Sequence, residues 1–289
     1  MRRNSELHGL EAEARRGIVV RETKCKTILN PSGISDYCLN CYTGCAHGCV
    51  YCYARFMQRF HPHPEPWGEF VDVKVNAVEA LERQLRRAKP GEVFVSSACD
   101  GWQPIEAERR LTRQCCAMLV AHGFQVHVLT KSALVLRDLD ILTGRKAQVG
   151  ITITTLDERL RTLWEPKSSR IKERWEVIEM ARGVGLKTAV MFGPLLPFLS
   201  DDQQSIDLLL QRAADLAIDT IWVDALNPRP KVWPAVAALL REWFPDLRER
   251  YGRLLFERSA RDAYLVQLRH RVTRAISRFS LTDRVTVCF

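Results

Sequence analysis

Three cysteines in one short stretch of this chain have a spacing suited to metal chemistry. Cys45, Cys49 and Cys52 are separated by three and then by two residues. Three thiolates that close in sequence can bind three of the four irons of a 4Fe–4S cube. Clusters that only transfer electrons usually have four cysteine ligands. These three residues, the cysteine triad, therefore predict a cluster whose fourth iron is open to a substrate or a cofactor.

Two CxxC pairs suggest a different metal. Cys38 and Cys41 form one pair, Cys49 and Cys52 form the other, and seven residues separate the two pairs. Zinc ribbons usually have about 15–20 residues at that point. The spacing therefore favours an iron–sulfur cluster over a structural zinc ion.

Cys25, Cys38 and Cys41 lie outside the triad and leave two alternatives open. Six of the ten cysteines fall between Cys25 and Cys52, within 28 residues, and this density indicates metal binding rather than core packing. The three could hold an auxiliary iron–sulfur cluster, with Cys99 the one further cysteine available as a ligand, or they could be buried free thiols. Three more cysteines in apolar surroundings are expected to be inert, buried thiols: Cys115, Cys116 and Cys288.

The residues around the triad narrow the chemistry. The stretch from Asn40 to Arg55, NCYTGCAHGCVYCYAR, places an aromatic residue, Tyr51, directly before the last cysteine of the triad. It resembles the radical SAM enzymes, and among them the branch related to spore photoproduct lyase, the DNA-repair-photolyase-like proteins. The resemblance implies that the open iron binds the amino and carboxylate groups of S-adenosylmethionine. Reductive cleavage of this cofactor then gives a 5′-deoxyadenosyl radical that abstracts hydrogen from the substrate.

The same resemblance suggests partners and a substrate class. It implies an external electron donor of the flavodoxin or ferredoxin type and favours a nucleic-acid substrate. Modification of a peptide or a small molecule is the alternative within radical SAM chemistry, and an auxiliary cluster would favour it. A zinc-stabilised nucleic-acid-binding protein is the alternative outside enzymes.

The resemblance also assigns roles to residues that follow the expected strands. Cys99 is the candidate catalytic residue, a hydrogen donor to the product radical, with a small buried strand-end residue as the alternative. Lys131 resembles the lysine placed at the cofactor carboxylate. His47 is expected to stabilise the loop by a hydrogen bond, with a contact to the cluster as the alternative. Further cofactor contacts are expected from Tyr51, Ser97, Asp100, Thr152 and Arg174; a solvated helix surface is the alternative for the last.

The elements that must position these residues alternate along the chain. Strands are expected at residues 92–97, 125–130, 148–154, 186–192 and 220–224, after a first strand just before the triad. Helices are expected at residues 76–88, 105–122, 132–144, 170–184 and 201–216, the first with Asn76 as its N-cap. Strands that alternate with helices predict a parallel sheet with right-handed crossovers.

The number of these units predicts the architecture. Six β/α units fall short of the about eight that close a TIM barrel. The expected fold is therefore α/β, a partial (β/α)6 barrel of the TIM type, which the resemblance also implies, with the chemistry at the C-terminal ends of the strands. Residues 1–36 are expected to form an N-terminal extension, residues 37–230 the radical SAM domain, and residues 231–289 an arginine-rich, mainly helical segment.

Charge and hydropathy bear on partners. The net charge is +9, and residues 241–278 hold ten arginines against five acidic residues. Arginines can bind phosphate, so some are expected to be free for nucleic acid, while most of the aromatic residues among them pack on the barrel. No apolar run approaches the about 18 residues of a membrane span, and the first residues lack a signal peptide. A cytoplasmic protein without a membrane association is therefore expected.

Overall fold

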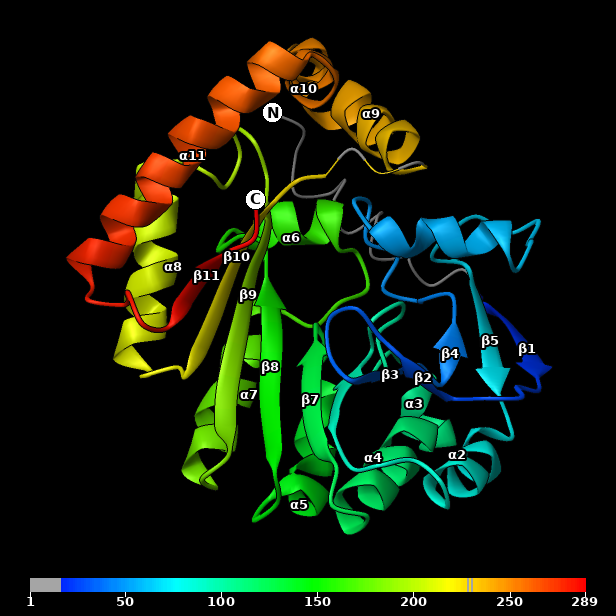
Figure 1. Ribbon diagram of the computed structural model, residues 1–289. Helices are drawn as coiled ribbons and strands as arrows, with labels where there is room; N and C mark the ends of the chain where they lie inside the picture. Colours follow the sequence, from blue (N-terminus) through cyan, green and yellow to red (C-terminus); the bar gives the residue numbers. More distant parts are fainter. Residues whose placement is uncertain (1–16, 228, 230) are drawn as a thin grey trace.

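Six neighbouring parallel strands form the centre of this computed structural model (Figure 1). Their order in the sheet follows their order in the chain. They are β3 (Tyr37–Leu39), β6 (Glu92–Val95), β7 (Gln125–Thr130), β8 (Ala147–Ile153), β9 (Lys187–Leu195) and β10 (Thr220–Ala225). The sheet does not close on itself, because β2 and β11 stand at its two edges. This is the predicted α/β fold, a partial (β/α)6 barrel.

The structure describes residues 17–227, 229 and 231–289. The first 16 residues of the expected N-terminal extension lie outside the described residues. Within the described part of the chain, no helix is long and apolar enough to cross a bilayer.

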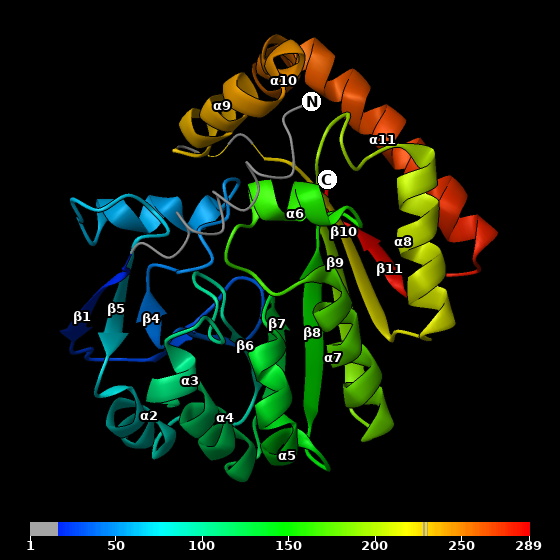
Figure 2. The same cartoon turned by 180° about the vertical axis from the view of Figure 1, so that it is seen from behind.

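Helices follow the strands and mostly cover the outer face of the sheet (Figures 1 and 2). They are η1 (Tyr53–Arg59), α2 (Ala77–Leu85), α3 (Glu106–Arg109), α4 (Leu111–Ala121), η2 (Ala133–Asp138), α5 (Leu139–Leu142), α6 (Glu158–Trp164), α7 (Ile171–Gly183) and α8 (Gln203–Asp215). The helix expected at 105–122 is interrupted at Arg110, which has a left-handed backbone with φ of 52°. Strand β8, near the middle of the sheet, is buried along its whole length, as expected for a strand covered on both faces.

The N-terminal segment adds strands that the sequence pattern did not predict. Strand β1 (Val19–Thr23) joins β5 (Phe70–Lys74) and β4 (Tyr42–Thr43) in a small second sheet, and β2 (Leu29–Pro31) pairs antiparallel with β3. All five residues of β1 are exposed, so it lacks the apolar alternation by which a half-buried strand is recognised.

Two side chains at α2 fasten this N-terminal segment. Asn76, expected to cap the helix, makes no capping hydrogen bond. Instead its side chain accepts a hydrogen bond from the Cys25 amide at 2.8 Å and donates one to the Cys25 carbonyl at 2.9 Å. Gln84 accepts hydrogen bonds from the amides of Ile28, at 2.7 Å, and Leu29, at 3.0 Å, and donates to the Leu29 carbonyl at 2.6 Å.

The C-terminal segment arches over the C-terminal ends of the barrel strands (Figures 1 and 2). It consists of α9 (Val232–Trp243), α10 (Pro245–Phe256), α11 (Arg258–Arg278) and β11 (Val285–Val287). Strand β11 pairs parallel with β10 and so extends the barrel sheet. Tyr251 and Tyr264 are buried, as expected for most of the aromatic residues here, whereas Phe256 is exposed. The Tyr251 hydroxyl donates to the Pro197 carbonyl at 2.6 Å.

Replacing Gln84 by alanine should destabilise the protein by about 2–3 kcal/mol, because two backbone amides and a carbonyl lose their partner together. Urea denaturation measures the change in the free energy of unfolding. Gln204→Ala, an exposed glutamine on α8, is the control and should stay within about 0.5 kcal/mol of the unmodified protein. Equal effects of the two substitutions would show that the side chain of Gln84 does not hold the N-terminal segment.

Candidate functional site

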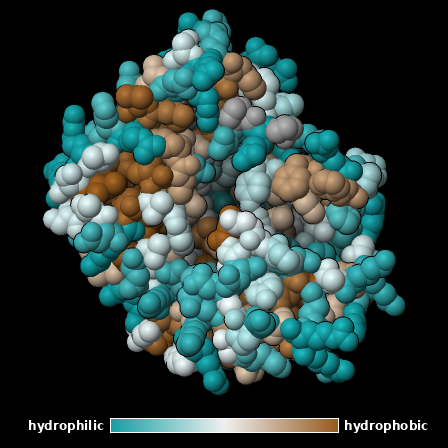
Figure 3. All heavy atoms as spheres, viewed as in Figure 1, coloured by the Kyte–Doolittle hydropathy of each residue, from teal (hydrophilic) through white to brown (hydrophobic). Residues whose placement is uncertain are grey.

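A cavity of about 1320 Å³ lies within the barrel and extends to the C-terminal ends of its strands. Figure 3 shows its opening as a hollow near the centre of one face. The cysteine triad lines the cavity, together with seven residues for which the sequence predicts a role: His47, Tyr51, Ser97, Cys99, Asp100, Lys131 and Thr152. Residues from the triad loop and from the ends of β6, β7 and β8 therefore share one space. Arg174 is not among the residues that line it.

The triad loop, residues 44–52, has a tightly turned backbone. Gly44 and Gly48 have φ of +82° and +65°, a left-handed conformation suited to glycine. A Cβ at Gly44 would also lie 2.5 Å from the carbonyl oxygen of Phe70. The fully buried Gln103 holds the loop from the other side, accepting from the Ala46 amide at 2.7 Å and donating to the Gly44 carbonyl at 3.4 Å. The two glycines therefore allow the tight turns of the triad loop.

The surroundings of the three triad thiols suit metal ligands. Burial raises the pKa of Cys45 well above its usual value, that of Cys49 to about 12, and that of Cys52 as well. Neighbouring thiols raise the pKa of Cys45 and Cys49 further. As free groups they are neutral, and a metal centre would replace their protons. Among the described residues no three His, Cys, Asp or Glu side chains converge on a single metal ion, whereas a cube takes each thiolate on a different iron. The donor set thus fits a cluster.

Asp100 connects the triad loop to the end of β7. Its carboxylate accepts hydrogen bonds from the Thr130 hydroxyl at 2.7 Å and from the amides of Trp102, at 2.9 Å, and Lys131, at 2.8 Å. His47 of the triad loop lies 3.3 Å from the same carboxylate. Burial acts to raise the pKa of Asp100, but His47 and these donors lower it well below its usual range. Both carboxylate oxygens are thus engaged by protein groups, which favours a positioning role for Asp100 and loop stabilisation for His47.

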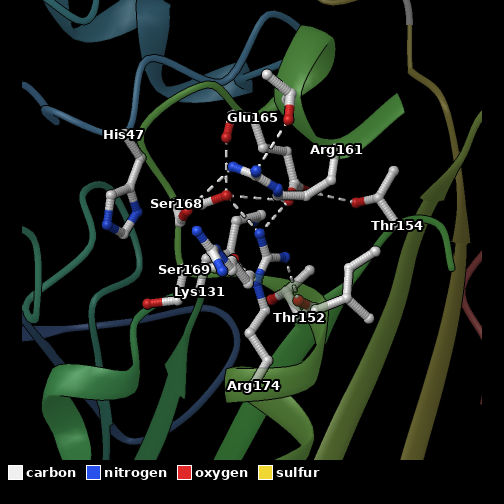
Figure 4. A network of polar contacts seen from close by, with 12 residues as sticks. His47, Lys131, Thr152, Thr154, Arg161, Glu165, Ser168, Ser169 and Arg174 are labelled. Atoms are coloured by element: carbon white, nitrogen blue, oxygen red, sulfur yellow. Dashed lines mark hydrogen bonds and ion pairs between the residues drawn. The ribbon is translucent and has the colours of Figure 1, made fainter. Parts of the chain in front are cut away.

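Arg174 is fully buried in α7, which excludes a solvated helix surface. Figure 4 shows its guanidinium pointing toward Glu165 and Ser168, and its closest ion pair is with Glu165, at 2.5 Å. It also donates to the Thr152 carbonyl at 2.8 Å and to the Ser169 carbonyl at 2.9 Å. The expected cofactor contact of Arg174 is therefore corrected. Its donors are used within the protein, and it positions the end of β8, from which the Thr152 side chain lines the cavity.

Glu165 links Arg174 to the triad loop by hydrogen bonds. It accepts hydrogen bonds from the hydroxyls of Tyr51 and Thr154, the latter at 2.8 Å. Burial acts to raise the pKa of Glu165, but Arg174, Lys131 and Tyr51 lower it to about 2. The Lys131 ammonium lies 5.7 Å from the centre of the Tyr51 ring. Burial also acts to lower the pKa of Lys131, but the nearby Cys49 and Glu165 more than offset this, so its pKa is raised.

Asn40 organises the segment that follows β6. Its side chain donates to the Ser97 hydroxyl at 2.9 Å and accepts from the Ala98 amide at 2.8 Å. The Cys99 thiol donates to the same side-chain oxygen at 3.7 Å. Burial raises the pKa of Cys99 to about 12, so this thiol keeps its hydrogen at neutral pH. Ser97 and Cys99 are thereby fixed against the cavity wall.

Comparison with known proteins places this arrangement in a family. Residues 39–209, which include the triad, Lys131, Thr152 and Arg174, match the family model of the radical SAM superfamily. The chain belongs to the radical SAM superfamily. It is a radical SAM enzyme, and the family implies a 4Fe–4S cluster and S-adenosylmethionine as cofactors.

Relatives of this radical SAM enzyme are found in archaea and bacteria. It is 32% identical over 187 residues to an uncharacterized protein of Methanocaldococcus jannaschii, covering 64% of this chain and 70% of that protein. It is 30% identical over 281 residues to an uncharacterized protein of Mycobacterium tuberculosis, covering 92% of this chain and 82% of that protein.

Among solved structures, the fold is that of spore photoproduct lyase. A double mutant of that enzyme with bound AdoMet and dinucleoside spore photoproduct matches with a TM-score of 0.70 and 16% identity, over 100% of this chain and 86% of the other. The enzyme complexed with dinucleoside spore photoproduct matches with a TM-score of 0.67. The chain thus shares the fold of spore photoproduct lyase.

The cysteines outside the triad of this radical SAM enzyme are dispersed. The buried Cys41 has its sulfur 3.8 Å from that of Cys115 on α4. Cys38 pairs in register with Phe94, and among the described residues no three metal-binding side chains come together on one ion, as a zinc site would require. Cys115 and Cys116 are fully buried, as expected. The expectation for Cys288 was wrong, since its side chain is exposed: it lies after the short edge strand β11, where little covers it.

The sequence assigned no role to three residues that shape the site of the radical SAM enzyme: Asn40, Gln103 and Trp67. Asn40 begins the 40–55 stretch, and Gln103 lies in the turn after β6, close to the residues that were assigned roles. Their positions could therefore have marked them as candidates. Trp67 lies between η1 and β5, where no motif was recognised, and only the structure brings it to the triad loop.

Replacing Glu165 by glutamine should destabilise the protein by about 3–5 kcal/mol at neutral pH, because Arg174 would stay buried without its counter-charge. The folded-state pKa of Glu165, about 2, is below the unfolded value of about 4.3. Its stabilisation is therefore present above the unfolded pKa and is lost as the pH falls toward the folded one. Chemical denaturation of the unmodified protein and of E165Q, at about pH 7 and about pH 3, should give a smaller difference in the acid.

The control for E165Q is Glu176→Gln, on the exposed side of α7. Glu176 pairs with Lys172 at 3.8 Å, and their side chains are 46% and 88% exposed, so the change should cost less than about 1 kcal/mol. A pH-independent effect of E165Q, or one no larger than that of E176Q, would contradict the assigned role of the buried pair.

Proposed function

We propose that this radical SAM enzyme binds a 4Fe–4S cluster through Cys45, Cys49 and Cys52 and abstracts hydrogen from a nucleic-acid substrate. The observation that carries the proposal is the presence of all three thiols on the wall of one cavity. When bound, the cluster and S-adenosylmethionine supply a 5′-deoxyadenosyl radical. The protein's own residues bind and orient the cofactor and keep water away from the reacting atoms.

Lys131 is proposed to bind the carboxylate of S-adenosylmethionine. Its side chain lines the cavity, and its raised pKa keeps it positively charged at neutral pH. Tyr51 and Ser97 line the same cavity beside it, and Thr152 offers a hydroxyl from the end of β8. Asp100 and Arg174 act indirectly: they hold the triad loop and the ends of β7 and β8 by the hydrogen bonds described above.

Cys99 is proposed as the catalytic hydrogen donor. A residue in that role must reach the substrate and must carry a hydrogen on sulfur. Cys99 lines the cavity, and its pKa of about 12 keeps the thiol protonated at neutral pH. Its hydrogen bond to Asn40 fixes the direction of the side chain. Transfer of the thiol hydrogen to a substrate radical would leave a thiyl radical on Cys99.

Charge and fold support a nucleic-acid substrate. The net charge is +9, and the helices α9, α10 and α11 carry eight exposed arginines: Arg241, Arg248, Arg250, Arg253, Arg258, Arg269, Arg274 and Arg278. Arg229, also exposed, lines the cavity. The solved structures with this fold include one bound to a dinucleoside. An external reductant of the flavodoxin or ferredoxin type is part of the proposal.

Anaerobic reconstitution with iron and sulfide should give about four irons per chain, and dithionite with S-adenosylmethionine should then yield 5′-deoxyadenosine. Chromatography of the products measures the nucleoside. Replacing Cys45, Cys49 and Cys52 together by alanine should abolish both iron binding and the product, because the cube loses every protein ligand. Cys288→Ser, at an exposed cysteine, should change neither.

Two other results of this reconstitution would revise the proposal. An intact cluster in the unmodified protein without any 5′-deoxyadenosine would overturn the reaction. About eight irons per chain would indicate a second cluster and bring Cys25, Cys38 and Cys41 into the chemistry.

Single-stranded DNA should bind with an affinity that falls steeply with salt, because binding to phosphates releases counterions. Fluorescence anisotropy between about 50 and 200 mM salt measures the slope. Replacing Arg229 and Arg250 by glutamine should lower that slope by about one for each phosphate that is no longer neutralised. Arg87→Gln, just after α2 and away from the cavity, is the control and should leave the slope unchanged. Absent or salt-independent binding would count against a nucleic-acid substrate.

A further inference from the structure

Two buried N–H groups near the triad loop make no hydrogen bond of standard geometry among the described residues. The indole nitrogen of Trp67 and Nε of Arg55 are among the few buried side-chain atoms that make no hydrogen bond within the described chain. Buried donors are rarely left without a partner, because the hydrogen bond to water that they give up is not replaced. A donor left unused beside the triad is available to a ligand sulfur that carries negative charge once a cluster is bound.

A close contact between two glycines brings Trp67 to the triad loop. Gly68 packs so tightly against Gly48 that a Cβ on Gly68 would lie 2.7 Å from the Gly48 Cα. The Trp67 ring is buried and meets Phe70 edge to face, at 5.9 Å between ring centres. Trp67 therefore has a fixed place in the segment between η1 and β5, against the loop that carries the triad.

The unpaired indole N–H of Trp67 is close enough to Cys52 to act on its thiol. Burial raises the pKa of the Cys52 thiol, and the Trp67 side chain opposes the rise, together with the charges of Lys131 and Arg55. A hydrogen bond from the indole would be stronger to a thiolate than to a neutral thiol, since the acceptor is then charged. Trp67 is thus placed to favour negative charge on this sulfur.

Arg55 adds a positive charge on the same side of the loop. It belongs to η1, directly after the triad, and is half-buried. One guanidinium nitrogen donates to the Cys49 carbonyl at 3.3 Å, which holds the group at the loop while its Nε stays unpaired. Burial acts to lower the pKa of Arg55, and charge on Cys52 or Cys49 raises it. The guanidinium therefore lies within the electrostatic reach of two of the three triad sulfurs.

We propose that Trp67 and Arg55 raise the reduction potential of the cluster, Trp67 by donating its N–H to the Cys52 sulfur and Arg55 by its charge beside Cys49 and Cys52. This inference rests on the proposed function, since it requires a cluster on the triad. Reduction adds one negative charge to the cluster. Hydrogen bonds to the ligand sulfurs and nearby positive charge stabilise that charge and make the cluster easier to reduce. Both residues act through the triad cysteines, so they are positioning residues. Their effect is on the reduction potential, which decides how easily the cluster takes up an electron.

The test is a potentiometric titration of the reconstituted protein, with the reduced cluster followed by electron paramagnetic resonance. Trp67→Phe keeps the ring and removes the N–H, and Arg55→Gln removes the charge. Both variants should keep the iron content of the unmodified protein and shift the midpoint potential to lower values. The combined variant should shift it further than either one alone.

Matched controls separate this effect from general damage to the core. Trp164→Phe changes another buried indole without a partner for its N–H. Its ring stacks on Tyr251, and the hydrogen bond that it makes to the triad loop, from the Val50 amide at 2.9 Å, uses its backbone carbonyl, which the substitution keeps. Arg59→Gln removes an exposed charge from the same helix, η1. Both controls should have the potential of the unmodified protein. Arg55→Lys keeps the charge and should keep most of the potential.

The outcomes separate this inference from the function on which it rests. If the unmodified protein takes up no cluster, the proposed function fails first. If it takes up the cluster but W67F and R55Q keep its midpoint potential, the tuning role alone is overturned. A shift in R55K as large as that in R55Q would also overturn the role of charge. If R55Q does not retain its iron, R55K decides alone: the charge role requires it to keep most of the potential of the unmodified protein, and a clearly lower potential would overturn that role.

Discussion

The buried ion pair of Glu165 and Arg174 is the interaction on which the shape of the cavity depends. A buried pair of charges is tolerated only where further hydrogen bonds satisfy its remaining polar atoms. Here those bonds reach Tyr51 on the triad loop, Thr154 and the Thr152 carbonyl at the end of β8. Three segments that are distant in sequence are thereby fixed to one another. The wall that would receive the cofactor is formed by the protein alone, which is the preorganisation that catalysis requires.

The opposite side of the triad depends on a second buried carboxylate, Asp100. It binds the end of β7 and lies against His47 of the triad loop. Each of the two carboxylates is satisfied mainly by its own partners, Glu165 by Arg174 and Asp100 by His47 and backbone amides. The ammonium of Lys131 is therefore not consumed by a direct ion pair with either one. A charged group that is buried and free to face the cavity is what an anionic ligand needs.

The sequence predicts the parts of this structure that rest on periodic patterns and local motifs. Strand β7 begins and ends where the pattern placed it, at 125–130, because apolar side chains alternate through it. Residues with a distant partner were harder to predict. Asn76 has the residue type of a helix cap, but its amide binds Cys25, 51 residues earlier. A carboxylate partner for Arg174 could be suspected from its motif, but only the structure shows that this partner is Glu165. The exposed strand β1 offers no pattern at all, since its stability comes from pairing with β5.

The edge strand β11 has a consequence for how the protein is made. Strand β10 ends at Ala225, whereas its parallel partner β11 begins only at Val285, after three helices. At ordinary rates of translation the ribosome needs roughly 3–12 s to add the intervening residues. During that interval the outer edge of β10 carries unpaired backbone groups, which are a template for pairing with another chain. Synthesis of this enzyme therefore includes a period in which an almost finished barrel needs protection from its neighbours, by a chaperone or by the ribosome itself.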